Sequence, residues 1–272
     1  MPLHISLSAE TLFTIFGFPI TNTIFTSWII VGFLSVVAVI IRKAFSPVPS
    51  EAGVSVSRIS QVTDTSRRES AGGVRRFSVL VEMIIGGLLG FFSTIAGSEE
   101  RAKRFFPIVA TIFFFVLFSN WFGIFPGVGT IAIEEVHDEK TVFVPILRTV
   151  FSDLNMTIMI ALISVVLSHV IGIRRLGRGH IGKYFSFKTP ITFFVGLLEL
   201  VGEFAKIVSF SFRLFGNIFA GEVLLVVIAF LIPVIIPIPF MGLELFVGLI
   251  QALIFATLTM VFFTVAEESH EH

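Results

Sequence analysis

The stretch Ser209-Phe-Ser-Phe-Arg-Leu-Phe-Gly-Asn-Ile-Phe-Ala-Gly-Glu222 places an arginine, Arg213, in the middle of a long apolar segment. This segment runs from Ile191 to Ile232 without a proline. A cation at bilayer depth costs from about 2.5 to more than ~10 kcal/mol, so it usually has a function. An arginine guanidinium also stays protonated at physiological pH. We therefore expect Arg213 to be a permanent positive charge that faces protein, water or a mobile counter-charge. A snorkelling or salt-bridged arginine is the alternative.

The composition indicates a membrane protein. The chain has 272 residues, of which 55% are hydrophobic and 14% charged, and its mean hydropathy is +0.98. A soluble domain carries about 25% charged residues. The absence of cysteine excludes disulfides, thiolate metal sites and cysteine nucleophiles. The six histidines are scattered, so we expect no metal site, no cofactor and no enzymatic activity of the chain alone. The formal net charge of zero gives no indication of nucleic-acid binding.

The apolar runs predict an all-α polytopic membrane protein with about six helices, including one interfacial helix and a pair of long, steeply tilted helices. Runs near 20 residues are long enough to span, and charged or proline-containing stretches separate them. In chain order the predicted segments are an outside N-terminus (1–23), a first transmembrane helix (24–41), a basic cytoplasmic loop (42–76), an interfacial or re-entrant helix (77–97), a transmembrane hairpin with an acidic outer loop (105–173), a long tilted hairpin (190–266) and a cytoplasmic tail (267–272).

The distribution of basic residues supports this topology. Fifteen of the nineteen lysines and arginines fall in the predicted inside loops. Lys140 and Arg148 fall outside, and Lys206 and Arg213 lie within the membrane. Cytoplasmic loops are enriched in basic residues, so the N-terminus is expected outside and the C-terminus inside. Segment 77–97 has basic clusters on both flanks, which favours a helix at the inner face over a crossing.

Segment 190–232 is too long for one vertical span. Forty-three residues of helix measure roughly 65 Å, about twice the thickness of the hydrocarbon layer. Two spans with a turn near Arg213 are one solution, and one oblique helix is the other. No proline or cluster of polar turn residues interrupts the segment, so we predict one oblique helix that ends before the turn at Pro233 and Pro237.

Polar residues on the two long segments lie on either side of Arg213. Asn217 is one turn away on the same helical face. At 100° per residue, Glu222 points about 180° away from Arg213 and lies roughly 14 Å toward the outside. The inner set consists of Glu199, Glu203 and Lys206, and the outer set of Glu222, Glu244 and Gln251.

The two sets describe an interrupted proton path. Carboxyl groups in poorly hydrated sites take up and release protons near neutral pH, and a cation that cannot lose its proton separates the two sets. As an alternative, Glu199 and Glu203 are simple ion-pair partners of Lys206. Glu222 and Glu244 have no basic partner in register nearby, so this alternative is weaker for them.

Other polar residues have less specific patterns. Asp153 is either a helix cap or a residue that gives water access, and both interpretations remain open. Asn120 lies near the outer end of its predicted span, and Asn155 opens the next one. His169 is expected to be a satisfied residue at an inner helix end.

The residues around Arg213 resemble the a subunits of rotary F-type ATP synthases. Two stretches carry the resemblance, Phe212-Arg-Leu-Phe-Gly-Asn-Ile-Phe-Ala-Gly-Glu222 and Gln251-Ala-Leu-Ile-Phe-Ala-Thr-Leu-Thr259. Softer agreement comes from Asn120 to Pro126, from Ser152-Asp-Leu-Asn155 and from Glu199 to Lys206. The resemblance covers about residues 105–268.

The resemblance implies a proton-translocating stator subunit beside a ring of c subunits, each with a membrane-embedded carboxylate. Arg213 would engage these carboxylates and prevent a direct proton leak between two offset half-channels. Glu244 falls where some relatives carry histidine. The outer half-channel would hold Asn217, Glu222, Glu244 and Gln251, with Asn120, Asp153 and Asn155 as helpers, and the inner one Glu199, with Glu203 as an extra acid beside Lys206.

The implied partners are the c ring, peripheral-stalk b subunits, the lipid bilayer and protons. The expected location is the plasma membrane of a bacterium. An ion-coupled secondary transporter or channel subunit is the alternative function, although the chain shows no inverted repeat.

Overall fold

The computed structural model describes residues 9–44, 68–125, 127–129, 131–137, 140–182, 184, 189–232 and 235–267. Six helices in these ranges are long and apolar enough to cross a membrane. The predicted all-α polytopic class is therefore confirmed. Most of the predicted basic loop 42–76 and of the predicted tail 267–272 lies outside the described residues.

The N-terminal part forms a small hairpin before the first long helix. β1 (Thr11–Ile15) pairs antiparallel with β2 (Phe18–Thr21). The connecting residues Phe16 and Gly17 both have positive φ, 50° and 84°, as in the two-residue turns that match the twist of paired strands. Helix α1 (Asn22–Ala44) follows directly. It is slightly longer at both ends than the predicted helix 24–41, and the hairpin was not predicted.

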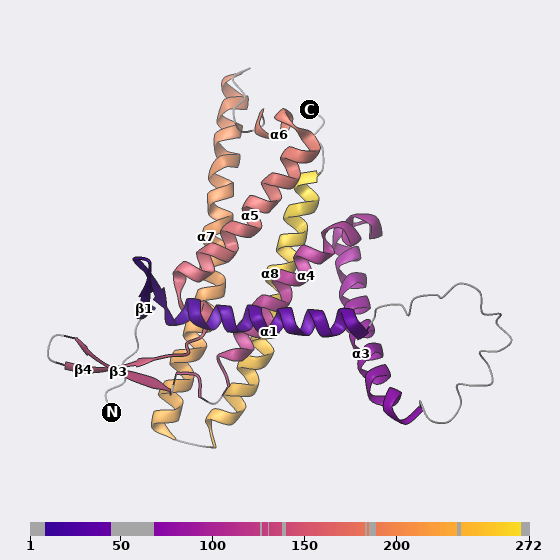
Figure 1. Ribbon diagram of the computed structural model, residues 1–272. Helices are drawn as coiled ribbons and strands as arrows, with labels where there is room; N and C mark the ends of the chain where they lie inside the picture. The colour runs from indigo at the N-terminus through magenta and orange to yellow at the C-terminus, as the bar shows by residue number, and fades with distance from the viewer. Residues whose placement is uncertain are drawn as a thin grey trace.

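Helices α3 (Arg68–Ala96) and α4 (Glu99–Phe122) form the next pair. Gly97, at φ 66°, separates them, and they pack against each other. α3 begins before the predicted start at residue 77, so the last residues of the predicted basic loop are helical. Figure 1 shows α3 crossing the C-terminal end of α1.

The predicted acidic outer loop contains a second hairpin. β3 (Ala132–His137) pairs antiparallel with β4 (Lys140–Pro145), and a short 3-10 helix, η1 (Val150–Ser152), follows. Helix α5 (Leu154–Leu176) and the short α6 (Arg178–Gly182) complete this region. The sequence analysis did not predict these strands, because each is short and the segment was interpreted from its charge alone.

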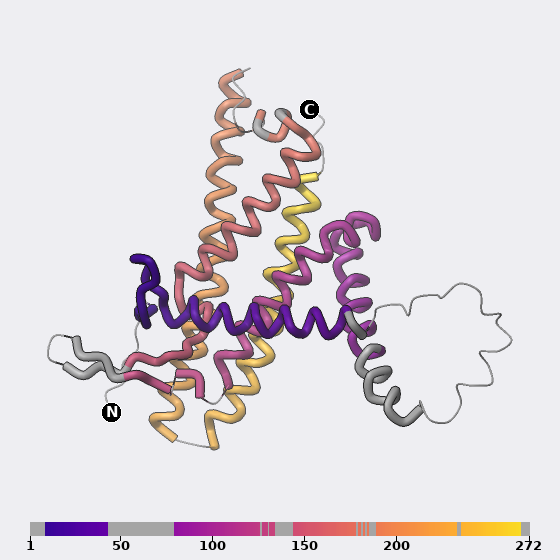
Figure 2. The backbone as a smooth tube through the Cα atoms, in the orientation of Figure 1, coloured from indigo at the N-terminus to yellow at the C-terminus, as the bar shows by residue number. Residues whose placement is uncertain are grey.

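Helix α7 (Pro190–Leu231) is unbroken over 42 residues, which confirms the prediction of one helix rather than two. Thr189 caps its N-terminus: its hydroxyl accepts a hydrogen bond from the Thr192 amide, as expected before a proline at the first helical position. Helix α8 (Pro237–Glu267) returns along it. The two helices are the orange and yellow traces of Figure 2.

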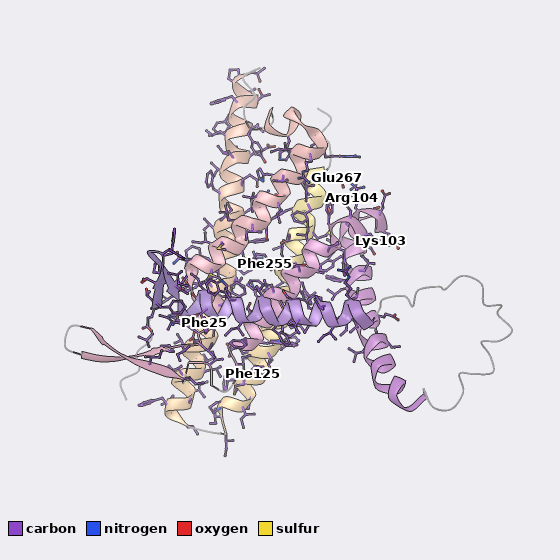
Figure 3. The ribbon with its side chains drawn as sticks, viewed as in Figure 1. Phe25, Lys103, Arg104, Phe125, Phe255 and Glu267 are labelled. Atoms are coloured by element: carbon purple, nitrogen blue, oxygen red, sulfur yellow. The ribbon has the colours of Figure 1, made fainter. Side chains whose placement is uncertain are left out.

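The core forms where α4, α5 and α7 pack with α8. Gly248, Ala252 and Ala256 repeat every four residues on α8 and are buried there, and small residues at this spacing let membrane helices approach closely. A side chain at Gly248 would lie 3.1 Å from Cβ of Asn120. Phe255, labelled in Figure 3, is among the fully buried core side chains.

Glu267, at the C-terminal end of α8, connects three helices through ion pairs. Its buried carboxylate forms ion pairs with Arg101 and Arg104 of α4 and, at 4.0 Å, with Arg175 of α5. Figure 3 shows Glu267 and Arg104 side by side. The predicted hairpin ends at residue 266, one residue before the end of α8. The ion pairs of Glu267 were not predicted, because its partners lie far away in the sequence.

Candidate functional site

Arg213 lies on the uncovered side of α7. Its side chain is exposed, and its guanidinium donates a long hydrogen bond of 3.4 Å to Oγ of Ser209 one turn earlier. Within the described part of the chain Arg213 forms no ion pair. The neighbouring residues Phe210, Leu214 and Ile218 form the buried face instead. The helix thus presents one cation among apolar residues on a surface that the other described elements leave open.

Glu222 lies on the packed side of α7, as its half-turn offset from Arg213 predicts. The Ser152 hydroxyl and the Arg148 guanidinium both lie within electrostatic range of its carboxyl group. Arg148 also donates from Nε to Oγ of Ser152 at 3.0 Å. The three side chains therefore form one polar cluster between η1 and α7.

The outer acids have no basic residue in helical register, and this cluster brings a cation near Glu222 from outside that register. Arg148 was assigned to the outer loop, and only 7% of its surface is accessible. Its backbone amide donates to the hydroxyl of Thr26 on α1 at 3.3 Å, which fixes this segment against the first helix. Arg148 and Glu222 share no helical register, so spacing along one helix could not have paired them.

Glu244 reaches from α8 to the same place. A Cβ atom on Gly221 would lie only 2.9 Å from a carboxyl oxygen of Glu244. Glu244 and Glu222 are also within electrostatic range of each other. The structure therefore brings the two predicted outer acids together, and the glycine before Glu222 provides the space for the second carboxyl group.

Asp153 serves as the cap of α5. One carboxylate oxygen accepts from the Asn155 amide at 3.0 Å, and the other accepts from the Thr23 hydroxyl at 3.1 Å. The cap interpretation is confirmed, and the carboxylate additionally fastens α5 to α1. Asn155 itself is exposed.

Asn120 and Gln251 are both buried beside the α4–α8 contact, at 2% and 7% exposure. The Asn120 amide donates to the Gly248 carbonyl at 3.0 Å, and the Trp121 indole donates to the Leu245 carbonyl at 3.0 Å. Asn217, one turn beyond Arg213, is half-buried.

Several buried oxygens in this half of the molecule have no hydrogen-bond partner among the described residues. They belong to five side chains on α1, α4, α7 and α8: Asn22, Ser119, Asn120, Glu222 and Glu244. Buried polar atoms in folded proteins are almost always hydrogen-bonded to protein or to ordered water. These oxygens make this part of the bundle suited to hold water.

The inner set is arranged differently. Glu203 accepts hydrogen bonds from the Lys206 ammonium at 2.8 Å and from the Tyr184 hydroxyl at 3.2 Å. Glu203 thus forms the ion pair with Lys206 that the alternative interpretation described. The Lys206 ammonium also lies 4.9 Å from the centre of the Phe262 ring on α8. Glu199, one turn before Glu203, is exposed.

The sequence analysis missed the aromatic side of this inner set. The Tyr184 hydroxyl lies 3.4 Å from Nε2 of His169, and the His180 ring packs against both side chains. Gly172 gives the His180 ring its space, since a side chain at Gly172 would collide with it. The only available signal was the spacing of the two histidines and the single tyrosine around the turn after α5. Among the described residues no group of three or more histidines and carboxylates could hold a metal ion.

Comparison with known proteins identifies the family of the chain. A family model described as ATP synthase A chain matches residues 24–264. The chain is 32% identical over 249 residues to the chloroplastic ATP synthase subunit a of Stigeoclonium helveticum, an alignment that covers 92% of this chain and 85% of the relative. It is 37% identical over 192 residues to ATP synthase subunit a of Syntrophobacter fumaroxidans, covering 70% and 71%. The chain therefore belongs to the ATP synthase A chain family, the a subunits of F-type ATP synthases.

Proposed function

We propose that this multi-pass membrane protein gives protons access to the carboxylates of a c ring through two offset half-channels, with Arg213 between them. The observation that carries the proposal is the exposed Arg213 on an otherwise apolar helix surface. A permanent charge in that position needs a counter-charge from another subunit. A carboxylate on each ring subunit, moving past α7, would supply it.

The outer half-channel follows the buried polar groups on the far side of α7. Glu222 and Glu244 are its titratable members, and Asn120 and Gln251 line the same region. The unpartnered oxygens there support a chain of water molecules. Asn217 lies between Glu222 and Arg213 in sequence and would connect the outer path to the ring surface. Asp153 and Asn155 act at its margin, where Asp153 holds α5 on α1.

Arg213 separates this path from the inner one. A ring carboxylate beside the guanidinium is stabilised in its ionised form, because an opposite charge nearby favours the charged state. The carboxylate therefore gives up its proton before it passes Arg213 and takes up another on the other side. A proton cannot cross directly, since the guanidinium itself does not lose its proton.

The inner half-channel starts at Glu199. This exposed carboxylate shares a stripe of α7 with Arg213, about 40° off its face and roughly 21 Å along the axis. The Glu203 carboxylate accepts hydrogen bonds from Lys206 and Tyr184. Glu199 would receive the proton from the ring, while the Glu203–Lys206 pair would set the electrostatic potential beside it.

Helix lengths support an oblique course for α7 and α8. The 23 residues of α1 measure about 35 Å, which matches a bilayer, whereas the 42 residues of α7 measure about 63 Å. α1 runs across the long axes of α7 and α8 in Figure 1. If α1 stands upright, α7 and α8 are steeply tilted, and α3 lies along the inner face.

The remaining assignments follow from family membership and charge. The N-terminus would be outside and the C-terminus cytoplasmic in a bacterial plasma membrane; the relative in Stigeoclonium helveticum is chloroplastic. Peripheral-stalk b subunits would hold the chain against the ring.

Proton flux into liposomes tests the proposal. Liposomes that contain this chain together with a purified c ring should conduct protons, and liposomes with either component alone should not. Equal flux from the chain alone would contradict the proposal and favour a self-contained channel or transporter.

A further inference from the structure

The aromatic cluster at the inner end of α5 enters the function proposed above only through the contact of Tyr184 with Glu203. His169 on α5, His180 on α6, and Tyr184 in the segment before α7 meet beside Glu203. His180 and Tyr184 are buried, at 4% and 7% exposure. The His169 and Tyr184 rings are stacked with centroids 6.0 Å apart. The cluster therefore connects two membrane helices through a segment outside the membrane.

The hydrogen bonds define which nitrogen of His169 carries a proton. Nδ1 lies 2.8 Å from the Val165 carbonyl oxygen, which can only accept, so Nδ1 is the donor. The Ser168 hydroxyl donates its proton to the same carbonyl at 2.7 Å. The Ser168 oxygen can therefore only accept a hydrogen bond from Nδ1. In the neutral imidazole Nε2 is therefore an acceptor, and it faces the Tyr184 hydroxyl at 3.4 Å.

Tyr184 has one hydroxyl proton for two acceptors. Burial, together with the nearby Glu203 and Glu199 carboxylates, raises the pKa of Tyr184, so the phenol keeps this proton. Its acceptors are Nε2 of neutral His169 and the Glu203 carboxylate. A proton from cytoplasmic water that adds to Nε2 removes the conflict: Nε2–H then donates to the Tyr184 oxygen, and Tyr184 donates to Glu203. Among the described residues, protonated His169 thus completes the chain of hydrogen bonds through Tyr184 to Glu203.

We propose that His169 is a proton-sensitive positioning residue for the inner half-channel, and that it slows proton passage when the cytoplasm becomes acidic. The proposal rests on the function proposed above. Protonated His169 fixes Tyr184 on Glu203 and adds a second cation beside Lys206. Two cations around one carboxylate repel a proton that passes the neighbouring Glu199 in either direction. Neutral His169 leaves one cation there and a less constrained Tyr184.

The other charged groups near His169 do not replace it. On α7 these are Glu199, Glu203 and Lys206, and on α6 the neighbour is His180. On α5 itself Arg175 is directed to Glu267 of α8. Histidine is the side chain whose charge ordinarily changes between about pH 5 and 8. His180 contacts the same tyrosine ring, so it needs a variant of its own.

Inverted membrane vesicles that contain the complete ATP synthase test the proposal, because their cytoplasmic face contacts the bath. ATP-driven proton uptake is measured from pH 5.5 to 8.5 and divided by the ATP hydrolysis rate of the same vesicles with an uncoupler. We expect the wild-type ratio to fall on the acid side. His169→Gln retains a polar group toward Tyr184 but cannot gain a proton, and Tyr184→Phe retains the ring stacking but removes the hydroxyl. His169→Gln should abolish the acid-side fall, Tyr184→Phe should reduce it because His169 can still gain its charge, and the double variant should be as flat as His169→Gln alone.

Controls distinguish the possible failures. His180→Gln and His137→Gln, the latter in the outer hairpin, should retain the acid-side fall. A wild-type profile without this fall, or an unchanged fall in His169→Gln, overturns the inference. A loss of the fall in His180→Gln alone assigns the effect to the wrong histidine and also overturns it. Uptake that persists in Arg213→Ala would instead contradict the function on which the inference rests.

Discussion

Gly221 and Glu244 are packed against each other, so that the carboxyl group of α8 occupies the space of an absent side chain on α7. A Cβ atom on Gly221 would lie 2.9 Å from a Glu244 carboxyl oxygen and 3.2 Å from its carboxyl carbon. This contact places Glu244 next to Glu222. A glycine in the middle of a helix costs about 0.5–1 kcal/mol relative to alanine, so its presence here has a structural reason.

Gly221→Ala should therefore lower proton-driven ATP synthesis several-fold while the complex still assembles. The new methyl group displaces the flexible end of Glu244, which costs little stability but moves the carboxyl group away from Glu222. Gly242→Ala on α8 is the matched control, because no atom lies within 4 Å of the position of its Cβ. Synthesis rates in energised vesicles, normalised to the amount of assembled complex, measure the effect. Equal rates in the two variants would show that the position of Glu244 is not critical.

Glu222 and Glu244 should act as one outer relay. Glu222→Gln and Glu244→Gln should each lower synthesis in part and shift its pH optimum, because one titratable group remains in the path. The double variant should lose far more than the product of the two single effects. A double-mutant cycle on synthesis rates measures this coupling. Independent, multiplicative losses would mean that the two acids lie on separate paths.

Arg148 should be required for the outer path. Arg148→Gln leaves the Glu222 carboxyl group without its nearby cation and removes the donor to Ser152. Arg148 is buried and its charge lies near the Glu222 carboxyl group, so we expect less assembled complex and at least tenfold slower synthesis per complex. Arg148→Lys retains the charge and should recover part of the activity, and Arg148→Gln with Glu222→Gln should recover assembly. Normal assembly and synthesis in Arg148→Gln would contradict the pairing.

The topology is testable with single cysteines, because the chain has none of its own. A membrane-impermeant maleimide should label residue 135, in β3, only from outside. It should label residue 99, at the start of α4, and residue 60, which lies outside the described residues, only from the cytoplasm. Labelling of residues 60 and 99 from opposite sides would show that α3 crosses the membrane rather than lying along its inner face.

The sequence predicts features that depend on local spacing. The apolar run without proline predicts one long α7. The half-turn offset between Arg213 and Glu222 correctly predicts that one is exposed and the other turns toward the bundle. These relationships follow from helix geometry alone.

Contacts between distant segments could not be predicted in this way. Arg148 approaches Glu222 only because Thr26 and Ser152 hold its segment between α1 and α7. Glu267 gathers its arginines from two other helices. The β3–β4 hairpin has only six residues in each strand. Its strand pattern is weak, so the outer loop was interpreted from its charges alone.

Arg213→Ala tests the central claim most directly. ATP synthesis driven by a proton gradient in energised vesicles is compared among this variant, the wild type and a Ser209→Ala control. The control removes only the hydrogen-bond partner of the guanidinium. We predict no synthesis above background in Arg213→Ala, because protonated ring carboxylates could then pass between the half-channels, and near wild-type synthesis in Ser209→Ala. ATP hydrolysis should persist in both variants. Near-normal synthesis in an assembled Arg213→Ala complex would contradict the account.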